Sequence, residues 1–162
     1  DGYKKIIATG KCDAAARAPY LKDFILASCY AGIAFGNAGC AAVHALSYSI
    51  GGAFHVPHGE ANYAFFTEVF KLYNAKNPTG KIAAANKIFA DILGCDVSVV
   101  YDELEKFLNN ILTKKRLSEY GMVEAQIDEF TKSTVDNQQR LLGNNYVPLS
   151  DAELRQIFVN LF

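Results

Sequence analysis

The chain has 162 residues, of which 51% are hydrophobic and 20% are charged, and its formal net charge is −1. This length suits one domain with a substantial core, and the near-zero charge gives no electrostatic basis for binding nucleic acid or an anionic membrane. The four cysteines show no CxxC spacing, and the apolar run 24–35 is too short for a membrane span. We therefore expect no secretory segment, no disulfide framework and a cytoplasmic location.

The first part of the chain predicts helices separated by one break. Residues 10–13 form the break, and Asp13 can cap the helix behind it. From about 15 to 35, apolar side chains on more than one face predict a central, enclosed helix. Gly36 and Gly39 then predict a kink or break. Between them, Asn37 can bond a backbone group or face an active-site cleft, and we favour the structural role.

The remainder of the chain also has helical rather than alternating patterns. Gly94 ends one predicted helix, Ser98 is expected to cap the next, and Ser150 with Glu153 forms a capping-box signature for the last. Helices are predicted at about 60–73, 81–93, from 98, 123–134, 135–142 and from 150 onward. The predicted fold class is all-α, a multi-helix bundle.

The segment from Phe35 to Phe66, FGNAGCAAVHALSYSIGGAFHVPHGEANYAFF, contains all three histidines. If His44 and His58 bind one metal ion, their ring nitrogens must lie roughly 3–4 Å apart. A continuous helix would separate the two positions by about 21 Å, so the chain must reverse between them. Gly51-Gly52 and Pro57 are where a reversal is expected, with a second helix starting near Gly59.

Spacing alone leaves an ordinary alternative open. A histidine on an apolar helix, such as His44, is commonly a core residue bonded to a carbonyl group, and His55 and His58 can form an ordinary pair in a loop. Tyr48 lies one helical turn after His44 on the same face. It therefore points into whatever cavity His44 lines, whether or not that cavity holds a metal.

The stretch VHALSYSIGGAFHVPHGEAN resembles the metal-binding signature of the iron-containing (group III) alcohol dehydrogenases. The preceding GIAFGNAG and the ending RLLGNNYVPLSDAELRQIF fit the same family, so the resemblance extends over nearly the whole chain. It implies that residues 1–162 are the C-terminal part of a dehydroquinate synthase-like helical domain. The NAD-binding domain and the first helices of that domain would then precede residue 1.

The resemblance also implies a site. Members of the family bind a catalytic divalent metal, Fe²⁺ or Zn²⁺, through an upstream Asp-x-x-x-His pair and two further histidines, which map onto His44 and His58. Tyr48 stands where many members carry a histidine close to the nicotinamide of NAD, so it is the expected catalytic and cofactor-contacting residue. His55 and Asn62 are the expected substrate-binding residues.

The implied partner is a small-molecule hydroxy acid or alcohol, bound by a homo-oligomeric full-length enzyme without nucleic acid or membrane. With two of four metal ligands, the 162 residues alone are expected to be inactive. Two alternatives stay open from the sequence. One is a related metal-dependent polyol dehydrogenase, and the other is a non-enzymatic helical interaction module with structural histidines.

Overall fold

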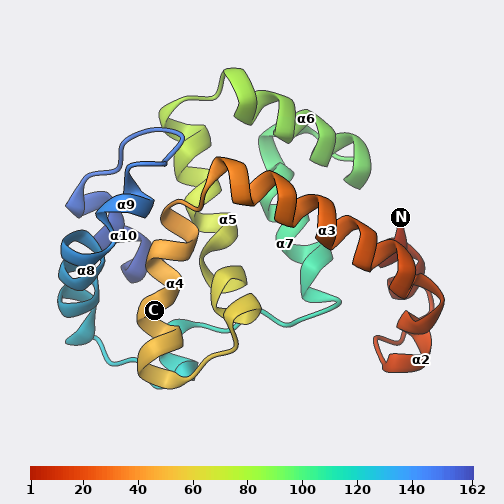
Figure 1. Cartoon of the computed structure of the whole chain (residues 1–162), viewed down its shortest axis with the longest axis horizontal. Coiled ribbons are helices and arrows are strands. Elements are labelled where there is room, and N and C mark those ends of the chain that lie inside the picture. Colours follow the sequence, from red (N-terminus) through yellow and green to blue (C-terminus); the bar gives the residue numbers. More distant parts are fainter.

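The computed structural model describes all 162 residues, and they form helices without any strand (Figure 1). The prediction of an all-α multi-helix fold is therefore confirmed. The α-helices and 3-10 turns follow in the order α1 (Gly2–Ala8), α2 (Ala14–Arg17), η1 (Ala18–Tyr20), α3 (Leu21–Ala38), α4 (Ala42–Phe54), α5 (His58–Lys76), α6 (Gly80–Leu93), η2 (Val97–Val99), α7 (Val100–Asn109), η3 (Leu117–Tyr120), α8 (Gln126–Asn137), α9 (Gln139–Leu142) and α10 (Asp151–Leu161).

Helices α4 and α5 run side by side in opposite directions at the centre of the molecule (Figure 1). Helices α8, α9 and α10 lie on one side of this pair, and α6 and α7 lie on the other. The main core is formed where α8 and α10 pack against the pair. There the ring of Phe65 meets that of Phe158 at 5.5 Å between centroids, edge to face. Burying such aromatic side chains is the main energetic gain in forming this layer.

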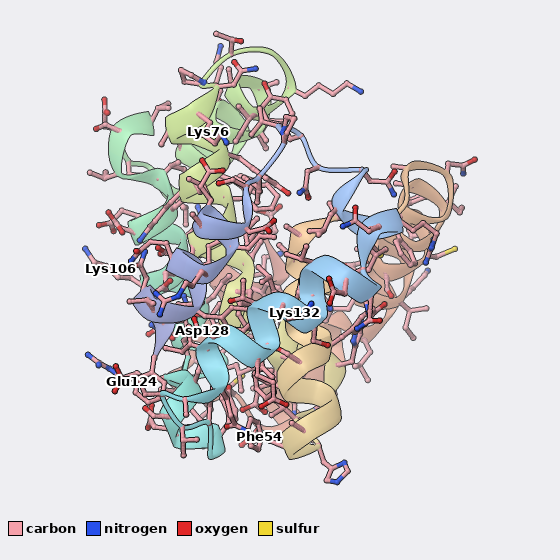
Figure 2. All side chains as sticks on the ribbon, turned by 90° about the vertical axis from the view of Figure 1, so that its left-hand side faces the viewer. Phe54, Lys76, Lys106, Glu124, Asp128 and Lys132 are labelled. Atoms are coloured by element: carbon pink, nitrogen blue, oxygen red, sulfur yellow. The ribbon has the colours of Figure 1, made fainter.

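Helix α8 shows how the sequence pattern produces this packing. Its buried residues, Ile127, Phe130, Thr131 and Thr134, recur at helical spacing and form one stripe. Asp128 and Lys132 lie on the opposite, outward face, where Figure 2 shows α8 in front of α4. The amphipathic pattern thus determines which face of α8 turns to the core.

A smaller core joins α6 and α7 beyond the main one. The Tyr101 hydroxyl of α7 donates to Asn86 of α6, and the Asn86 amide donates to Asn74 of α5 at 2.7 Å. Burial raises the pKa of Tyr101 to about 12, so its hydroxyl keeps its proton and remains a donor. This chain of hydrogen bonds fixes α6 and α7 relative to α5.

Most predicted helix ends agree with the structure. Gly94 ends α6 in the left-handed conformation at φ 72°, and Ser150 and Glu153 form the expected reciprocal capping box of α10. The prediction for Ser98 is wrong, because Asp96 is the capping residue and accepts a hydrogen bond from the Ser98 backbone N–H at 2.8 Å. The 3-10 turn η2 therefore precedes α7, which begins at Val100 and not at Ser98.

Helix α3 differs from its prediction as a central, enclosed helix, because none of its residues is buried. Leu21 and Ile25 are 52% and 70% exposed, since no other helix of residues 1–162 packs along its length (Figure 1). The predicted break after it is confirmed at Gly39, whose φ is 77°. Asn37 has the favoured structural role, donating to the Ile33 carbonyl at 2.7 Å.

No single helix has both the length and the hydropathy required to cross a bilayer. The stretch 14–38 and helix α4 meet that requirement only as a pair, and this pair is bent by 106°. All four cysteines are free thiols.

Candidate metal centre

The reversal of the chain between α4 and α5 lies later than predicted. Helix α4 continues through Gly51 and Gly52, so the expected break at this pair is wrong. A glycine costs about 1 kcal/mol in a helix relative to alanine, which is too little to interrupt a helix whose neighbouring turns are buried. The chain turns instead at His55, the only non-glycine residue with positive φ (54°), and at Pro57 directly before α5. Proline suits this place because it lacks the N–H that a helix start leaves unpaired.

This turn brings His44 of α4 beside His58, the first residue of α5. Their ring centroids are 5.1 Å apart, with the ring planes inclined by 55°. Nε2 of His44 lies 3.3 Å from Nδ2 of Asn62, and Nε2 of His58 lies 3.0 Å from the same nitrogen. Both imidazoles therefore direct Nε2 at one common point.

Ser47 determines how Asn62 faces the two rings. The buried Ser47 hydroxyl donates to Oδ1 of Asn62 at 2.7 Å, which leaves the amide N–H groups turned toward His44 and His58. A neutral imidazole with its proton on Nδ1 could accept these N–H groups at Nε2. Neutral imidazole with a free Nε2 lone pair is the form in which histidine binds a metal ion.

The electrostatic environment of His44 favours the neutral form of its ring. Burial of the half-buried ring lowers the pKa of His44 below its usual 6.5, and the charge that His58 would carry lowers it further. The donor set thus fits a divalent metal ion. Residues 1–162 place no group of three or more His, Cys, Asp or Glu side chains where it could hold a metal, so His44 and His58 would be two ligands of a larger set.

Two aromatic residues flank the histidine pair. Tyr48 is 44% exposed, and its ring lies 6.3 Å from that of His58 with the planes 28° apart. Phe35, at the end of α3, stacks on His44 at 6.1 Å between centroids and 12° between planes. The predicted site residues His44, Tyr48, His58 and Asn62 are therefore brought together. His55 is not, since it lies on the exposed turn and makes no hydrogen bond with them.

The sequence analysis did not single out Ser47 or Phe35. Ser47 lies three positions after His44 and Asn62 four after His58, so helical spacing already placed each on the face of its histidine. That spacing is a usable signal for residues that orient the rings. Phe35 belongs to a different helix, and no local pattern connects it with His44.

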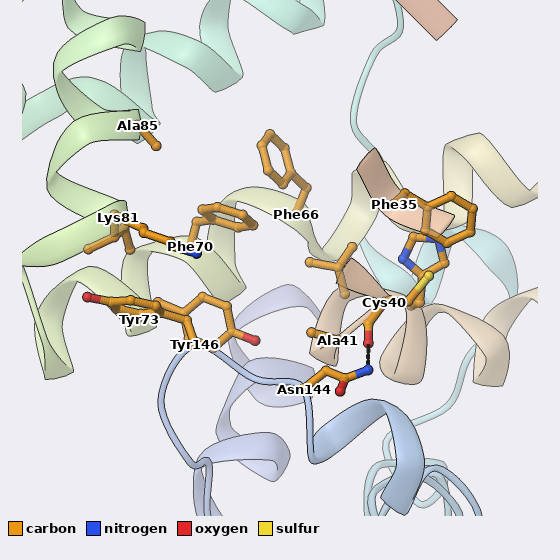
Figure 3. Close-up of a pocket in the computed structure, with 14 residues that line it drawn as sticks. Phe35, Cys40, Ala41, Phe66, Phe70, Tyr73, Lys81, Ala85, Asn144 and Tyr146 are labelled. Carbon is orange, nitrogen blue, oxygen red and sulfur yellow. Dashed lines mark hydrogen bonds between the residues drawn. The ribbon is translucent and has the colours of Figure 1, made fainter. Parts of the chain in front are cut away.

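A cavity of about 550 Å³ opens beside the histidine pair, between the end of α3, helix α5, the start of α6 and the connection from α9 to α10. Most of its lining is apolar, including Val43, Phe66 and Phe70. Figure 3 shows Phe35 at one end of the cavity and Lys81 at the other. Phe35 stacks on His44, which also lines the cavity. His58 does not line it, so the cavity extends from His44 to the start of α6.

The chain belongs to the iron-containing alcohol dehydrogenase family. Its residues 1–162 match the family model described as Fe-containing alcohol dehydrogenase family, C-terminal. It is 51% identical to the 4-hydroxybutyrate dehydrogenase of Clostridium kluyveri over 162 residues, which are 100% of this chain and 43% of that protein. It is 35% identical to long-chain-alcohol dehydrogenase 1 of Geobacillus thermodenitrificans over 146 residues, 86% of this chain and 36% of that protein.

Solved structures of other proteins also have a similar fold. The crystal structure of a 1,3-propanediol oxidoreductase matches with a TM-score of 0.66 and 22% sequence identity, covering 82% of this chain and 35% of that one. The chain thus spans less than half the length of these relatives.

Proposed function

We propose that this chain is the C-terminal, metal-contributing part of an NAD-dependent iron-type alcohol dehydrogenase that interconverts 4-hydroxybutyrate and succinate semialdehyde. The observation that carries this is the convergence of two Nε2 atoms on one point in a family named for its iron. The 51% identity to a 4-hydroxybutyrate dehydrogenase supports the substrate. Because the chain covers 43% of that relative, the NAD-binding domain, the first helices and two further metal ligands would lie outside residues 1–162.

In this proposal, His44 and His58 hold a divalent metal, Fe²⁺ or Zn²⁺, through the lone pairs that Asn62 now satisfies. When bound, the metal supplies a Lewis acid that lowers the pKa of the substrate hydroxyl. Ser47 fixes the Asn62 amide so that its N–H groups face both Nε2 atoms, and these N–H groups would have to turn away when the metal binds. The apolar cavity beside them excludes water from the carbon that loses hydride to the nicotinamide.

Tyr48 is the proposed catalytic and nicotinamide-contacting residue of this chain. Its ring lies beside His58 and is 44% exposed, so its phenol can receive the alcohol proton and pass it to solvent. Substrate contacts by His55 and Asn62, the homo-oligomeric state and the cytoplasmic location stay predictions.

A second candidate substrate is a primary alcohol with a longer apolar chain. The apolar lining of the cavity favours it, and so does the similarity to a long-chain-alcohol dehydrogenase. The same lining disfavours a polyol such as glycerol, because each buried hydroxyl without a partner costs free energy.

The complete protein, supplied with NAD and Fe²⁺, tests the proposal by its kcat/KM for 4-hydroxybutyrate, 1-butanol and glycerol. We expect the highest value for 4-hydroxybutyrate, and no turnover by the 162-residue chain alone. Absence of turnover of every alcohol by the complete protein would overturn the proposed function.

Replacing a histidine separates a metal ligand from a structural residue. We expect His44→Ala to lose bound metal, measured by elemental analysis, while its circular dichroism stays that of the wild type. His55→Ala is the matched control and should retain the metal. Unfolding of His44→Ala, with no effect of metal on either protein, would favour the non-enzymatic module.

A further inference from the structure

We propose, on the basis of the proposed function, that Lys81 binds the carboxylate of the substrate and so selects hydroxy acids over plain alcohols. Lys81 stands in the first turn of α6 and lines the cavity at the end away from His44. Figure 3 shows its side chain extending from α6 toward Phe70, and the residue is exposed to solvent. Of the lining residues it is the only one with a permanent charge.

The other polar side chains around Lys81 already have partners. Three lining residues donate hydrogen bonds to fixed acceptors: Tyr73 to Oδ1 of Asn145 at 2.7 Å, Tyr146 to the Thr79 carbonyl at 2.6 Å, and Asn144 to the Cys40 carbonyl at 3.1 Å. Lys81 forms neither a hydrogen bond nor an ion pair with any residue, unlike Lys71, which pairs with Asp102 at 2.6 Å. Its ammonium is therefore the donor that remains available to a ligand.

The start of α6 adds a second favourable contribution for an anion. This helix has 14 residues, no acidic residue in its first turn and no side-chain hydrogen bond from Thr79 at its N-cap. The positive end of its dipole is thus uncompensated on the side where Ile82 and Lys81 line the cavity. A carboxylate here would gain a charge-assisted hydrogen bond from Lys81 and a favourable field from the helix.

His44 at one end of the cavity and Lys81 at the other offer partners for the two ends of an ω-hydroxy acid. The hydroxyl lies at the histidine pair and the carboxylate at Lys81, while the methylene groups between them contact Phe66 and Phe70. A hydroxy acid has an apolar middle and one charged end, so it satisfies Lys81 without leaving a hydroxyl unpaired against the apolar wall. A plain alcohol of the same length contacts the apolar wall of the cavity but leaves the Lys81 ammonium without a partner.

The test compares 4-hydroxybutyrate with 1-butanol, which has the same number of carbons and no carboxylate. In the complete protein with NAD and Fe²⁺, Lys81→Gln removes the charge and Lys81→Arg retains it. We expect Lys81→Gln to lower the ratio of kcat/KM for 4-hydroxybutyrate to that for 1-butanol by about ten- to a hundredfold, the range for one hydrogen bond to a charged group. The loss should appear mainly as a higher KM for the hydroxy acid, and Lys81→Arg should retain most of the ratio.

Lys87→Gln is the matched control, because Lys87 is exposed on the same helix and does not line the cavity. It should leave the ratio unchanged. Calorimetric titration with butyrate gives a readout without turnover, and Lys81→Gln should weaken this binding by a similar factor. An unchanged ratio in Lys81→Gln would overturn the role of Lys81 and leave the proposed function standing. Failure of the wild type to oxidise 4-hydroxybutyrate would instead overturn the proposed function, and the role of Lys81 with it.

Discussion

Asn62 is the side chain on which the geometry of the histidine pair depends. It contacts Nε2 of both His44 and His58, and Ser47 fixes its orientation. Because the Asn62 amide occupies the two Nε2 lone pairs that a metal would need, we expect Asn62→Leu, which removes the amide at similar size, to raise the affinity of the complete protein for a divalent metal by about two- to tenfold, the effect of one hydrogen bond that no longer has to be broken. The measurement is calorimetric or dialysis titration with Zn²⁺ or Fe²⁺, with circular dichroism to establish folding.

Two companion variants make this prediction sharper. Ser47→Ala leaves Asn62 in place without its hydrogen bond, so its effect on metal affinity should be smaller and in the same direction. Asn137→Leu changes an exposed amide on α8, far from the histidines in sequence, and should leave the affinity unchanged. Metal affinity of Asn62→Leu equal to or below that of the wild type would show that the Asn62 amide does not compete with the metal for the two lone pairs.

Among these side chains, the sequence predicted the paired histidines and placed Tyr48 on their face. It could do so because the stretch around His44 and His58 resembles a family's metal-binding signature, whereas their spacing alone left structural histidines as an alternative. The hydrogen bond of Ser47 to Asn62 crosses between two helices. It depends on the distance at which α4 and α5 pack, which no spacing within either helix determines.

The boundary of α4 shows why a single helix end is harder to predict than helix identity. The Gly51-Gly52 pair looked like a break because of its low intrinsic helix propensity. Leu46 and Ile50 of the same helix are fully buried against the main core, and this packing outweighs the intrinsic cost of the glycines. The reversal before α5 was predictable at Pro57, because proline interrupts a helix for a steric reason that packing seldom overrides.

A partly buried cluster joins α5 to α7 and to the loop behind it. Nζ of Lys114 lies 2.7 Å from the Glu105 carboxylate and 2.9 Å from the hydroxyl of the fully buried Thr67, which also donates to Glu105. Burial acts to raise the pKa of Glu105, but the hydrogen bonds from Lys114 and Thr67 and the charges of Lys114 and Lys71 outweigh it and lower the pKa below its usual 4.5.

The lowered pKa determines how this cluster responds to acid. At pH values between the pKa of Glu105 in the folded chain and its pKa in the unfolded chain, the unfolded chain binds more protons. The contribution of Glu105 to the free energy of unfolding is therefore complete above about pH 4.5 and is lost as the pH falls through its pKa in the folded chain. We expect Glu105→Gln to lower the free energy of unfolding by about 1.5–3 kcal/mol at neutral pH. The difference from the wild type should shrink below pH 4.5, as measured by urea unfolding at both pH values.

Glu103 on the same helix provides the comparison for Glu105. It pairs with Lys106 at 2.6 Å, but the Lys106 side chain is 71% exposed, and exposed pairs contribute little to stability. Glu103→Gln should therefore leave the free energy of unfolding nearly unchanged at either pH. An equal effect of the two substitutions would show that Glu105 acts only through the net charge of the chain.

Considered as one molecule, residues 1–162 have an unequal distribution of packing. Helices α4, α5, α8 and α10 share the main core, whereas α3 has no buried residue along its 18 positions. Its exposed large hydrophobic residues are Leu21, Ile25, Leu26, Tyr30, Ile33 and Phe35. The composition of α3 predicted an enclosed helix, and the proposed domain organisation gives a reason for the difference, because the covering helices would precede residue 1.

Hydrogen exchange tests this reason directly. In the 162-residue chain, α3 has no buried residue, so its amides should open locally at little free-energy cost and exchange rapidly. In the complete protein, covering helices should slow the exchange of the same amides by at least tenfold. The amides of α5 around the buried Phe65 and Val69 are the control and should exchange slowly in both proteins. Peptide-resolved mass spectrometry measures this ratio. Equal protection of α3 in the two proteins would mean that its apolar face stays uncovered in the complete enzyme and that no preceding helix packs there.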